Sequence, residues 1–316
     1  MKLKTEIKPQ KSKNTIDYYS RLLLVGSCFS DTIANKLKSH RFDVISNPFG
    51  ISYNPSSIFY QLTRAIEQQL FVKEEFFLDD DLWHHYELHS SWSSTDLIQL
   101  TNSANDQLAH LHQQLKQSTH LIITLGTAFV YELKSSHTLV SNCHKQEAAL
   151  FEKRLVSPDE ILKSMEQFFQ KVTEFNPTLQ LIFTLSPVRH IKDGIIENNR
   201  SKAHLRCALF EFLEQHDTCE YFPSYELLLD ELRDYRFYDR DLVHPNELAI
   251  ELIWEHFVKT YMNESCLADM KLAQTIHKSS THQPFQPQSH QHQLFLKKLN
   301  ERITTFYTKY PHLKVS

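Results

Sequence analysis

Glycine is scarce in this 316-residue chain, which has only four. Ordinary usage of about 7% would give roughly twenty. Loops that cradle phosphates need several glycines close together, and the sequence has no Walker loop and no dinucleotide fingerprint. We therefore predict no cofactor, and we expect the glycines to stand where no side chain fits. They are Gly26, Gly50, Gly126 and Gly194.

Long apolar runs and paired cysteines are also missing. No segment approaches the length of a membrane span, and the polar residues 1–20 lack the apolar core of a secretion signal. The five cysteines are odd in number and scattered, which favours reduced thiols over a disulfide framework. The net charge of −4 gives no sign of a nucleic-acid partner or an anionic membrane. These absences predict a soluble, cytoplasmic protein.

A histidine-rich stretch, WHHYELH at residues 83–89, is a place to look for a metal site. Zinc sites of the H-E-x-x-H type need the glutamate directly after the first histidine. Here Glu87 stands two residues after His85, which is the wrong offset. We predict no metal, and we expect this stretch to line the mouth of a site instead.

The chain alternates between apolar runs and helical patterns. The helical patterns repeat apolar residues every three or four positions, as in Phe29, Ile33 and Leu37. This alternation predicts a doubly wound parallel sheet with helices on both faces. The five runs of strand character are 21–26, 42–46, 120–126, 179–185 and 220–225.

The chain is predicted to divide near residue 264. Residues 1–264 are assigned to one α/β domain, with an aromatic-rich insertion near 60–100. Residues 265–316 are expected to contain a polar linker rich in His and Gln and to end in an amphipathic helix that packs on or beside the domain. The apolar face of that helix consists of Leu296, Leu299, Ile303 and Phe306.

Two residues of nucleophilic type, Ser27 and Cys28, follow the first predicted strand directly. Ligands of such sheets bind beyond the carboxyl ends of the strands, so this position is a candidate site. The start of the following helix is expected to lower the pKa of a thiol and to hold an oxyanion. A nucleophile of this kind needs a base and an orienting carboxylate, and Asp241 and His244 in DLVHP have a spacing that one turn brings into contact. A simple turn with a capping aspartate is the alternative for that pair.

Other polar groups follow neighbouring strands. The glycine at position 50 would let its backbone N–H approach a reacting carbonyl. Arg189 and His190 follow the fourth strand, where an arginine can clamp a carboxylate or phosphate. An internal ion pair is an equally good role for that arginine.

Five motifs in chain order resemble a known family. They are VGSCFS, NPFGISYNP, TLGTAFVYE, SPVRH and DYRFYDRDLVHP, over roughly residues 15–260. They are similar to the GSCFA family within the SGNH/GDSL hydrolase superfamily. The resemblance implies a flavodoxin-like three-layer fold with a five-stranded parallel sheet. It also implies chemistry on acyl esters, with the acyl group on a sugar or a similar alcohol.

The resemblance also compares the two nucleophile candidates. The first block of the superfamily is G-D-S, so Gly26 matches the glycine, Ser27 falls on the aspartate and Cys28 on the nucleophile. We favour Cys28, while Ser27 would need a shift of one residue at a sharp turn. Ala128 stands where the superfamily has an oxyanion-binding asparagine. The oxyanion would then rest on the backbone N–H groups of Cys28 and Gly50, helped by Thr127 or Asn47.

The leading hypothesis is a hydrolase in which Cys28 or Ser27 attacks an ester carbonyl, His244 moves the proton and Asp241 orients the ring. An acyltransferase with the same residues is one alternative. A non-catalytic ligand-binding protein is the other, and Ala128 is its best support. The expected partner is a small-molecule or carbohydrate acyl ester, and no oligomeric state is predicted.

Overall fold

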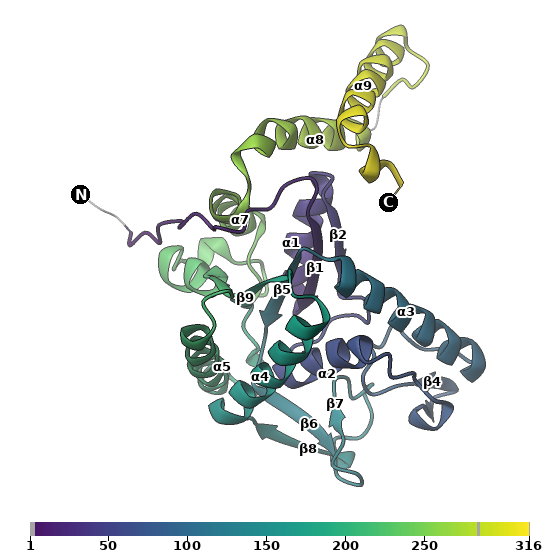
Figure 1. The fold of residues 1–316 in the computed structure, drawn as a ribbon, viewed down its shortest axis with the longest axis vertical. Coiled ribbons are helices and arrows are strands. Elements are labelled where there is room, and N and C mark those ends of the chain that lie inside the picture. Colours follow the sequence, from purple (N-terminus) through teal and green to yellow (C-terminus); the bar gives the residue numbers. More distant parts are fainter. Residues whose placement is uncertain (1–3, 283–284, 316) are drawn as a thin grey trace.

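The centre of the molecule is a five-stranded parallel sheet (Figure 1). The computed structural model describes residues 4–282 and 285–315. The strands of the sheet follow the order β10-β9-β5-β1-β2, which is the flavodoxin-like order when the five strands are numbered along the chain. The prediction of a flavodoxin-like α/β fold is therefore confirmed. The strands are β1 (Arg21–Gly26), β2 (Asp43–Ser46), β5 (His120–Leu125), β9 (Gln180–Leu185) and β10 (Glu220–Phe222).

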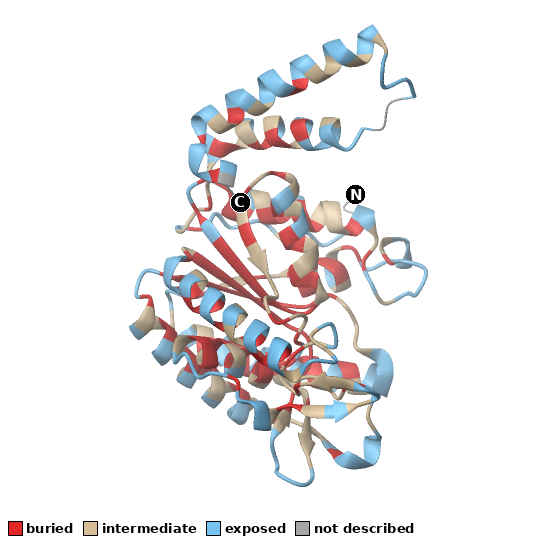
Figure 2. Cartoon of the chain, turned by 90° about the vertical axis from the view of Figure 1, so that its right-hand side faces the viewer, coloured by how far each residue is buried: buried red, intermediate tan, exposed pale blue. Residues whose placement is uncertain are grey.

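Both faces of the sheet are covered, as the continuous apolar runs require. All six residues of β5 are buried. In β1, Leu22 and Leu24 pack on one face and Leu23 and Val25 on the other, as the two-residue period of a strand dictates. Figure 2 shows these buried strands between layers of helices.

The helices separate into two groups by the face they cover. One face carries α1 (Cys28–Ser39) and α7 (Glu247–Tyr261). The other face carries α2 (Pro55–Ile66), α3 (Leu97–Gln117), α4 (Pro158–Phe175) and α5 (Ile195–Gln215). The apolar stripes in the sequence, such as Ile161, Met165, Phe168 and Val172 of α4, are the buried residues of these helices.

The fifth strand is shorter than predicted. The run 220–225 was expected to be a strand throughout, but β10 ends at Phe222. Pro223 follows, and because proline has no backbone N–H it cannot continue the hydrogen-bonded ladder. Ser224 instead begins the short helix α6 (Ser224–Glu226), which continues into the π-helical turn Leu227–Glu231.

The expected insertion contains more regular structure than predicted. Its first residues belong to α2, which packs against α4. A hairpin of β3 (Phe77–Asp79) and β4 (Leu82–His84) follows.

A three-stranded antiparallel sheet beyond the insertion was not predicted at all. It consists of β6 (Phe129–Leu133), β7 (Leu139–Val140) and β8 (Phe151–Leu155). In Figure 1 it lies at the end of the molecule away from α8 and α9.

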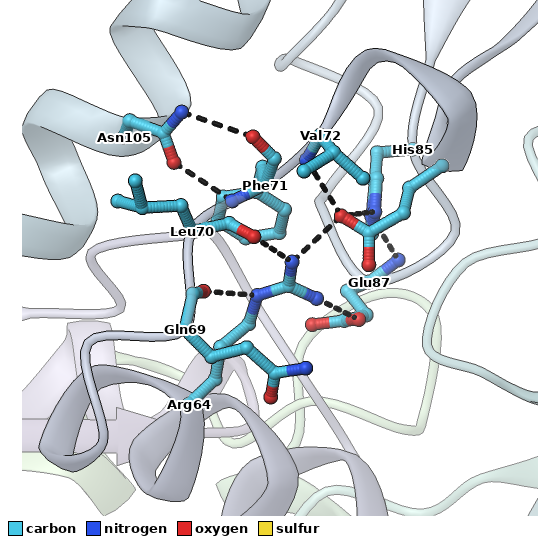
Figure 3. A network of polar contacts seen from close by, with 9 residues as sticks. Arg64, Gln69, Leu70, Phe71, Val72, His85, Glu87 and Asn105 are labelled. Atoms are coloured by element: carbon cyan, nitrogen blue, oxygen red, sulfur yellow. Dashed lines mark hydrogen bonds and ion pairs between the residues drawn. The ribbon is translucent and has the colours of Figure 1, made fainter.

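A buried arginine holds the insertion together (Figure 3). The side chain of Arg64 is 1% exposed, and its guanidinium pairs with Glu75 at 2.7 Å and with Glu87 at 2.8 Å. It also donates to the carbonyls of Gln69 and Leu70, each at 2.9 Å. Every part of this buried cation therefore faces an acceptor, which is the condition under which a charge is tolerated inside a protein.

Two helices form the C-terminal region. The sequence analysis assigned no element to most of α8 (Leu267–Ser280), whereas it predicted the amphipathic helix that forms α9 (His290–Lys309). Leu299 and Phe306 of that predicted apolar face are buried. The ring of Phe306 packs edge-on against Tyr18 at 5.2 Å, which ties the tail to the segment before β1.

The division of the chain near residue 264 stays a prediction, and residues 283–284 of the expected linker lie outside the described residues. Among the described helices, none combines the length and the apolar character that crossing a membrane would require.

Candidate active site

The carboxyl ends of three neighbouring strands meet at one edge of the sheet. The register pairs Gly26 of β1 with Thr124 of β5, and Thr124 with Thr184 of β9. The segments that follow these strands therefore begin side by side. We call this place the strand-end edge, and the predicted site residues 27–28, 126–128 and 186–190 all begin there.

A glycine makes the turn from β1 into α1 possible. Gly26 has φ of +124°, and a Cβ at this position would lie 2.1 Å from the carbonyl oxygen of Thr124. The N–H of Ser27 donates to the same oxygen at 3.2 Å. No residue with a side chain fits here without moving the backbone of β5, as the scarcity of glycine predicted.

Ser27 and Cys28 have different positions in the turn. Ser27 is the N-cap of α1, and its side chain accepts a hydrogen bond from the N–H of Phe29 at 3.3 Å. It is only 1% exposed. Cys28 is the first residue of the helix and is partly exposed. The serine is thus engaged in capping, while Cys28 is partly exposed and its side chain takes no part in the cap.

The ionisation of the Cys28 thiol differs from the expectation. Burial raises the pKa of Cys28, and the nearby carboxylate of Asp31 raises it further. The backbone N–H groups of residues 28 and 29 and the Lys202 ammonium act in the opposite direction. The helix start alone therefore does not lower the pKa of this thiol, because the loss of hydration outweighs it.

Asp241 and His244 form the predicted pair. Nδ1 of His244 lies 2.6 Å from Oδ2 of Asp241, and Oδ1 accepts the N–H groups of Val243 and His244. These hydrogen bonds hold the pKa of Asp241 at about 2. Both side chains are about half exposed. In the part of the chain that the structure describes, no hydrogen bond joins the His244 ring to Ser27 or Cys28.

The loop after β2 offers one engaged and one unengaged donor. The N–H of Gly50 donates to the carbonyl of Asn47 at 2.7 Å, which closes the turn. Oδ1 of Asn47 accepts the N–H of Gly26 at 2.8 Å, while its Nδ2 is buried and has no hydrogen-bond partner. Of these two predicted oxyanion donors, only the Asn47 amide is unengaged.

The loop after β5 points into the protein. Oγ1 of Thr127 lies 2.9 Å from Oγ of Ser201 and accepts the N–H of Phe129 at 3.1 Å. The N–H of Ala128 donates to Ser201 at 2.7 Å, and both residues of the loop are buried. The Thr127 hydroxyl is therefore occupied by contacts with α5.

Arg189 lacks the internal ion pair that was one of its two predicted roles. Its Nη2 donates to the hydroxyl of Tyr238 at 3.0 Å, and its guanidinium lies over the rings of Tyr238 and Tyr235. No salt bridge to it occurs among residues 4–282 and 285–315. The neighbouring His190 has its ring 6.0 Å from that of Tyr53, and burial lowers its pKa.

Two residues near the thiol were not predicted. The Tyr53 hydroxyl is close enough to Cys28 for the thiolate to raise its pKa, although burial raises it more. Lys202 of α5 is 2% exposed, and its Nζ donates to the carbonyl of Ser186 at 2.7 Å. The sequence carries a signal for this lysine, because it falls on the same helical stripe as the buried Leu205 and Leu209.

A cluster of metal-ligand types lies in the insertion rather than at the strand-end edge. Ligand atoms of Glu75, His85 and Glu87 all lie within 4.8 Å of one another, and Nε2 of His85 has no hydrogen-bond partner. The Arg64 guanidinium already bonds both carboxylates, so the positive charge that this cluster needs is supplied by the chain (Figure 3).

Comparisons with known proteins agree with the motifs. The model of the GSCFA family matches residues 21–257, and that of the GSCFA domain protein, C-terminal domain, matches residues 273–316. No curated protein matches. Among solved structures, the chain is similar to an acetyl xylan esterase (Est2A) from the rumen bacterium Butyrivibrio proteoclasticus. The TM-score is 0.33 and the identity 10%, over 67% of this chain and 57% of that one. The chain thus spans little more than half the length of that esterase.

Proposed function

The chain belongs to the GSCFA family, and from this premise we propose that it is an SGNH-type hydrolase of acyl esters with Cys28 as its nucleophile. The observation that carries the proposal is that Ser27 and Cys28 have different roles in the turn after β1. Ser27 caps the helix with its side chain, and Cys28 is the partly exposed first residue of the helix. The expected substrate is a small acyl group on a sugar or a similar alcohol, as the superfamily resemblance implies.

The proposed reaction has two steps. The Cys28 thiolate attacks the ester carbonyl, and collapse of the tetrahedral intermediate breaks the bond to the alcohol, which leaves with a proton from His244. Water then attacks the thioester, with His244 taking its proton, and the carboxylic acid and the thiol are released. Asp241 fixes the tautomer of the ring through its bond to Nδ1.

The proton transfer requires the His244 ring to reach the reacting atoms. The ring stands on an exposed turn that is held by the bridge between Tyr238 and Pro245. Catalytic hydrogen bonds are often long in free enzymes and shorten when the substrate binds. We therefore place the contact between His244 and the leaving group in the substrate complex.

The oxyanion is assigned to two donors. The N–H of Cys28 begins a helix and has no carbonyl within that helix to bond. The Asn47 amide is the second, because its Nδ2 is unengaged. Gly50 and Thr127 would first have to give up the hydrogen bonds they make. Arg189 is assigned to an anionic group of the substrate, since no carboxylate of the described chain pairs with it.

Trapping of the acyl-enzyme tests the proposal. The protein is mixed with p-nitrophenyl acetate, the burst of p-nitrophenol is measured, and the added acetyl mass is located by peptide mass spectrometry. We expect one acetyl group on Cys28, lost in Cys28→Ala, retained in Ser27→Ala and formed more slowly in His244→Ala. Cys207→Ala is the matched control, because Cys207 is an exposed thiol that belongs to α5 and not to the turn after β1. Acetylation of Ser27 would overturn the choice of nucleophile.

The same assay separates the alternatives. An adduct that persists until an alcohol or amine is added would identify an acyltransferase. The absence of both burst and adduct would favour a binding protein, for which the buried Ala128 is the supporting observation, because no side-chain donor stands at that position.

A further inference from the structure

Lys202 is a buried cation without an ion-pair partner. It is 2% exposed, and its Nζ makes one hydrogen bond, to the carbonyl of Ser186. No carboxylate forms a salt bridge with it among residues 4–282 and 285–315. Its other neighbour is the ring of Tyr225, whose centroid lies 5.6 Å from Nζ. A buried ammonium is normally paired with an anion, so the acidic groups near Lys202 are the candidates for its partner.

The position of Lys202 puts it at the strand-end edge. Ser186 directly follows β9, which is paired with β5, and β5 is paired with β1. The turn that carries Cys28 begins at the end of β1. The lysine amine and the thiol therefore lie at the same edge of the sheet, the amine beside the end of β9 and the thiol beside the end of β1, with β5 between them.

The charged groups around the lysine leave one anion to serve it. Cys28 acts on the Lys202 amine more strongly than Glu226, which is the other acidic neighbour. The Glu226 carboxylate already has partners, because it accepts from the Tyr221 hydroxyl at 2.7 Å and lies 3.5 Å from Arg206. Lys202 is in turn the cation that acts on the Cys28 thiolate.

We propose that Lys202 is a positioning residue whose ammonium is the counter-ion of the Cys28 thiolate. The proposal deepens the proposed function, on which it rests for its role in acyl transfer. Burial lowers the pKa of Lys202 to about 7, so this amine exchanges its proton near neutral pH. The proton that leaves the thiol stays with the lysine, and the pair has no net charge before or after the transfer.

Several other groups face this pair and modify its ionisation. From α1, the Asp31 carboxylate opposes the thiolate. The charge of the thiolate acts on the phenol of Tyr53, and that of the lysine acts on the His190 imidazole. Asp31 therefore provides a variant with an effect opposite in sign to that of Lys202.

Alkylation of Cys28 by iodoacetamide measures the thiolate without any acyl substrate. The sulfur displaces iodide and forms a thioether, and the rate follows the fraction of thiolate present. The rate at the Cys28 peptide is measured by mass spectrometry from pH 6 to 10. The exposed Cys207 of the same protein is the internal control, since it reports the reactivity of a thiol on the protein surface.

We expect the profile of Lys202→Met to move to higher pH by about one unit, which is about a tenfold slower reaction at pH 7. Asp31→Asn should move it to lower pH, and Lys202→Arg should restore most of the wild-type profile. The Cys207 profile should not change. Lys202→Gln serves as the second variant if the methionine side chain impairs folding, which a thermal melt detects.

An unchanged Cys28 profile in a folded Lys202 variant would overturn the proposal, and so would an equal change at Cys207. Failure of the proposed function looks different. In that case the alkylation profile shifts as expected while p-nitrophenyl acetate leaves no acetyl group on Cys28.

Discussion

Arg64 and Lys202 are both cations that the fold buries almost completely, and their surroundings differ. Arg64 is met by two carboxylates and two carbonyls (Figure 3). Lys202 is met by one carbonyl and one aromatic ring. The arginine joins α2 to the loops around Glu75 and Glu87, whereas the lysine joins α5 to the strand-end edge.

The difference separates a stabilising ion pair from a functional charge. A buried charge with a full set of partners stays in one ionisation state, which suits a structural role such as the attachment of loops to a helix. A buried charge with too few partners costs stability and changes its proton near neutral pH, and groups of this kind gather at functional sites. The comparison predicts opposite responses when each cation is removed.

The largest expected effect is that of Arg64→Met. Removal of the guanidinium leaves Glu75 and Glu87 without a cation, and breaking a buried pair in this way costs about 3–5 kcal/mol. Urea unfolding measures the loss. Arg154→Met is the matched control, since Arg154 also pairs with two glutamates but its own side chain is 39% exposed. Its loss should stay below about 1 kcal/mol. An equally small loss in Arg64→Met would contradict the view of this network as a structural core.

Lys202→Met should act in the opposite direction. Replacement of a poorly partnered buried charge by an apolar side chain of similar volume is expected to leave stability unchanged or raise it, by about 1–4 kcal/mol at pH 7. The sign follows from the pKa of about 7 in the folded protein, below the value of 10.5 for a free lysine. The folded state binds fewer protons between these two values, so wild-type stability rises with pH through this window.

The gain of Lys202→Met should therefore be full below about pH 7 and fade toward pH 10.5. Urea unfolding of both proteins at pH 7 and pH 10 checks this. A difference that stays constant across the window would mean that Lys202 keeps its proton in the folded protein as it does in the unfolded chain, and it would remove the contrast with Arg64.

Ser27→Ala gives a smaller loss. The side chain caps α1, and loss of an N-cap of this type costs about 1 kcal/mol. Because the serine is assigned to capping, the acetyl adduct on Cys28 should still form. Thermal melting and the trapping assay are run together, with Ser157→Ala at the N-cap of α4 as the control for a capping loss far from the thiol. Loss of the adduct with no loss of stability would reverse the roles of the two residues.

The sequence predicted the parts of the molecule that have strong local patterns. All six residues of β5 are buried, and a short, continuous apolar run is typical of a strand that is covered on both faces. The sheet of β6, β7 and β8 escaped prediction because its strands are only two to five residues long and mostly of intermediate burial. Its pairing depends on contacts between segments and not on the pattern within one.

The same distinction applies to the site. The bond between Asp241 and His244 lies within one turn, so the spacing of the two residues was sufficient to predict it. The capping role of Ser27 was also readable, because serine is among the preferred residues before a helix. The engagement of Gly50 and Thr127 and the burial of Lys202 depend on how distant loops and helices pack. No local pattern specifies that packing.

Asp241→Asn should have the smallest effect on stability, and it adds an exposed pair to the comparison of the two buried cations. Both partners of this pair are about half exposed, so water replaces the lost carboxylate and the thermal midpoint should change little. An amide at this position can hold the wrong tautomer of the His244 ring, and in catalytic triads that error costs up to about 10⁴-fold in rate.

The acetylation assay of this variant can be run from pH 5 to 9. Because the pKa of Asp241 is about 2, the carboxylate stays ionised across that range, and wild-type activity is not limited by its protonation. Asp239→Asn, in the same turn and without a bond to the ring, is the control. Equal acetylation rates in Asp241→Asn and the wild type would assign the pair to the turn alone and leave Lys202 as the group that supports the Cys28 thiolate.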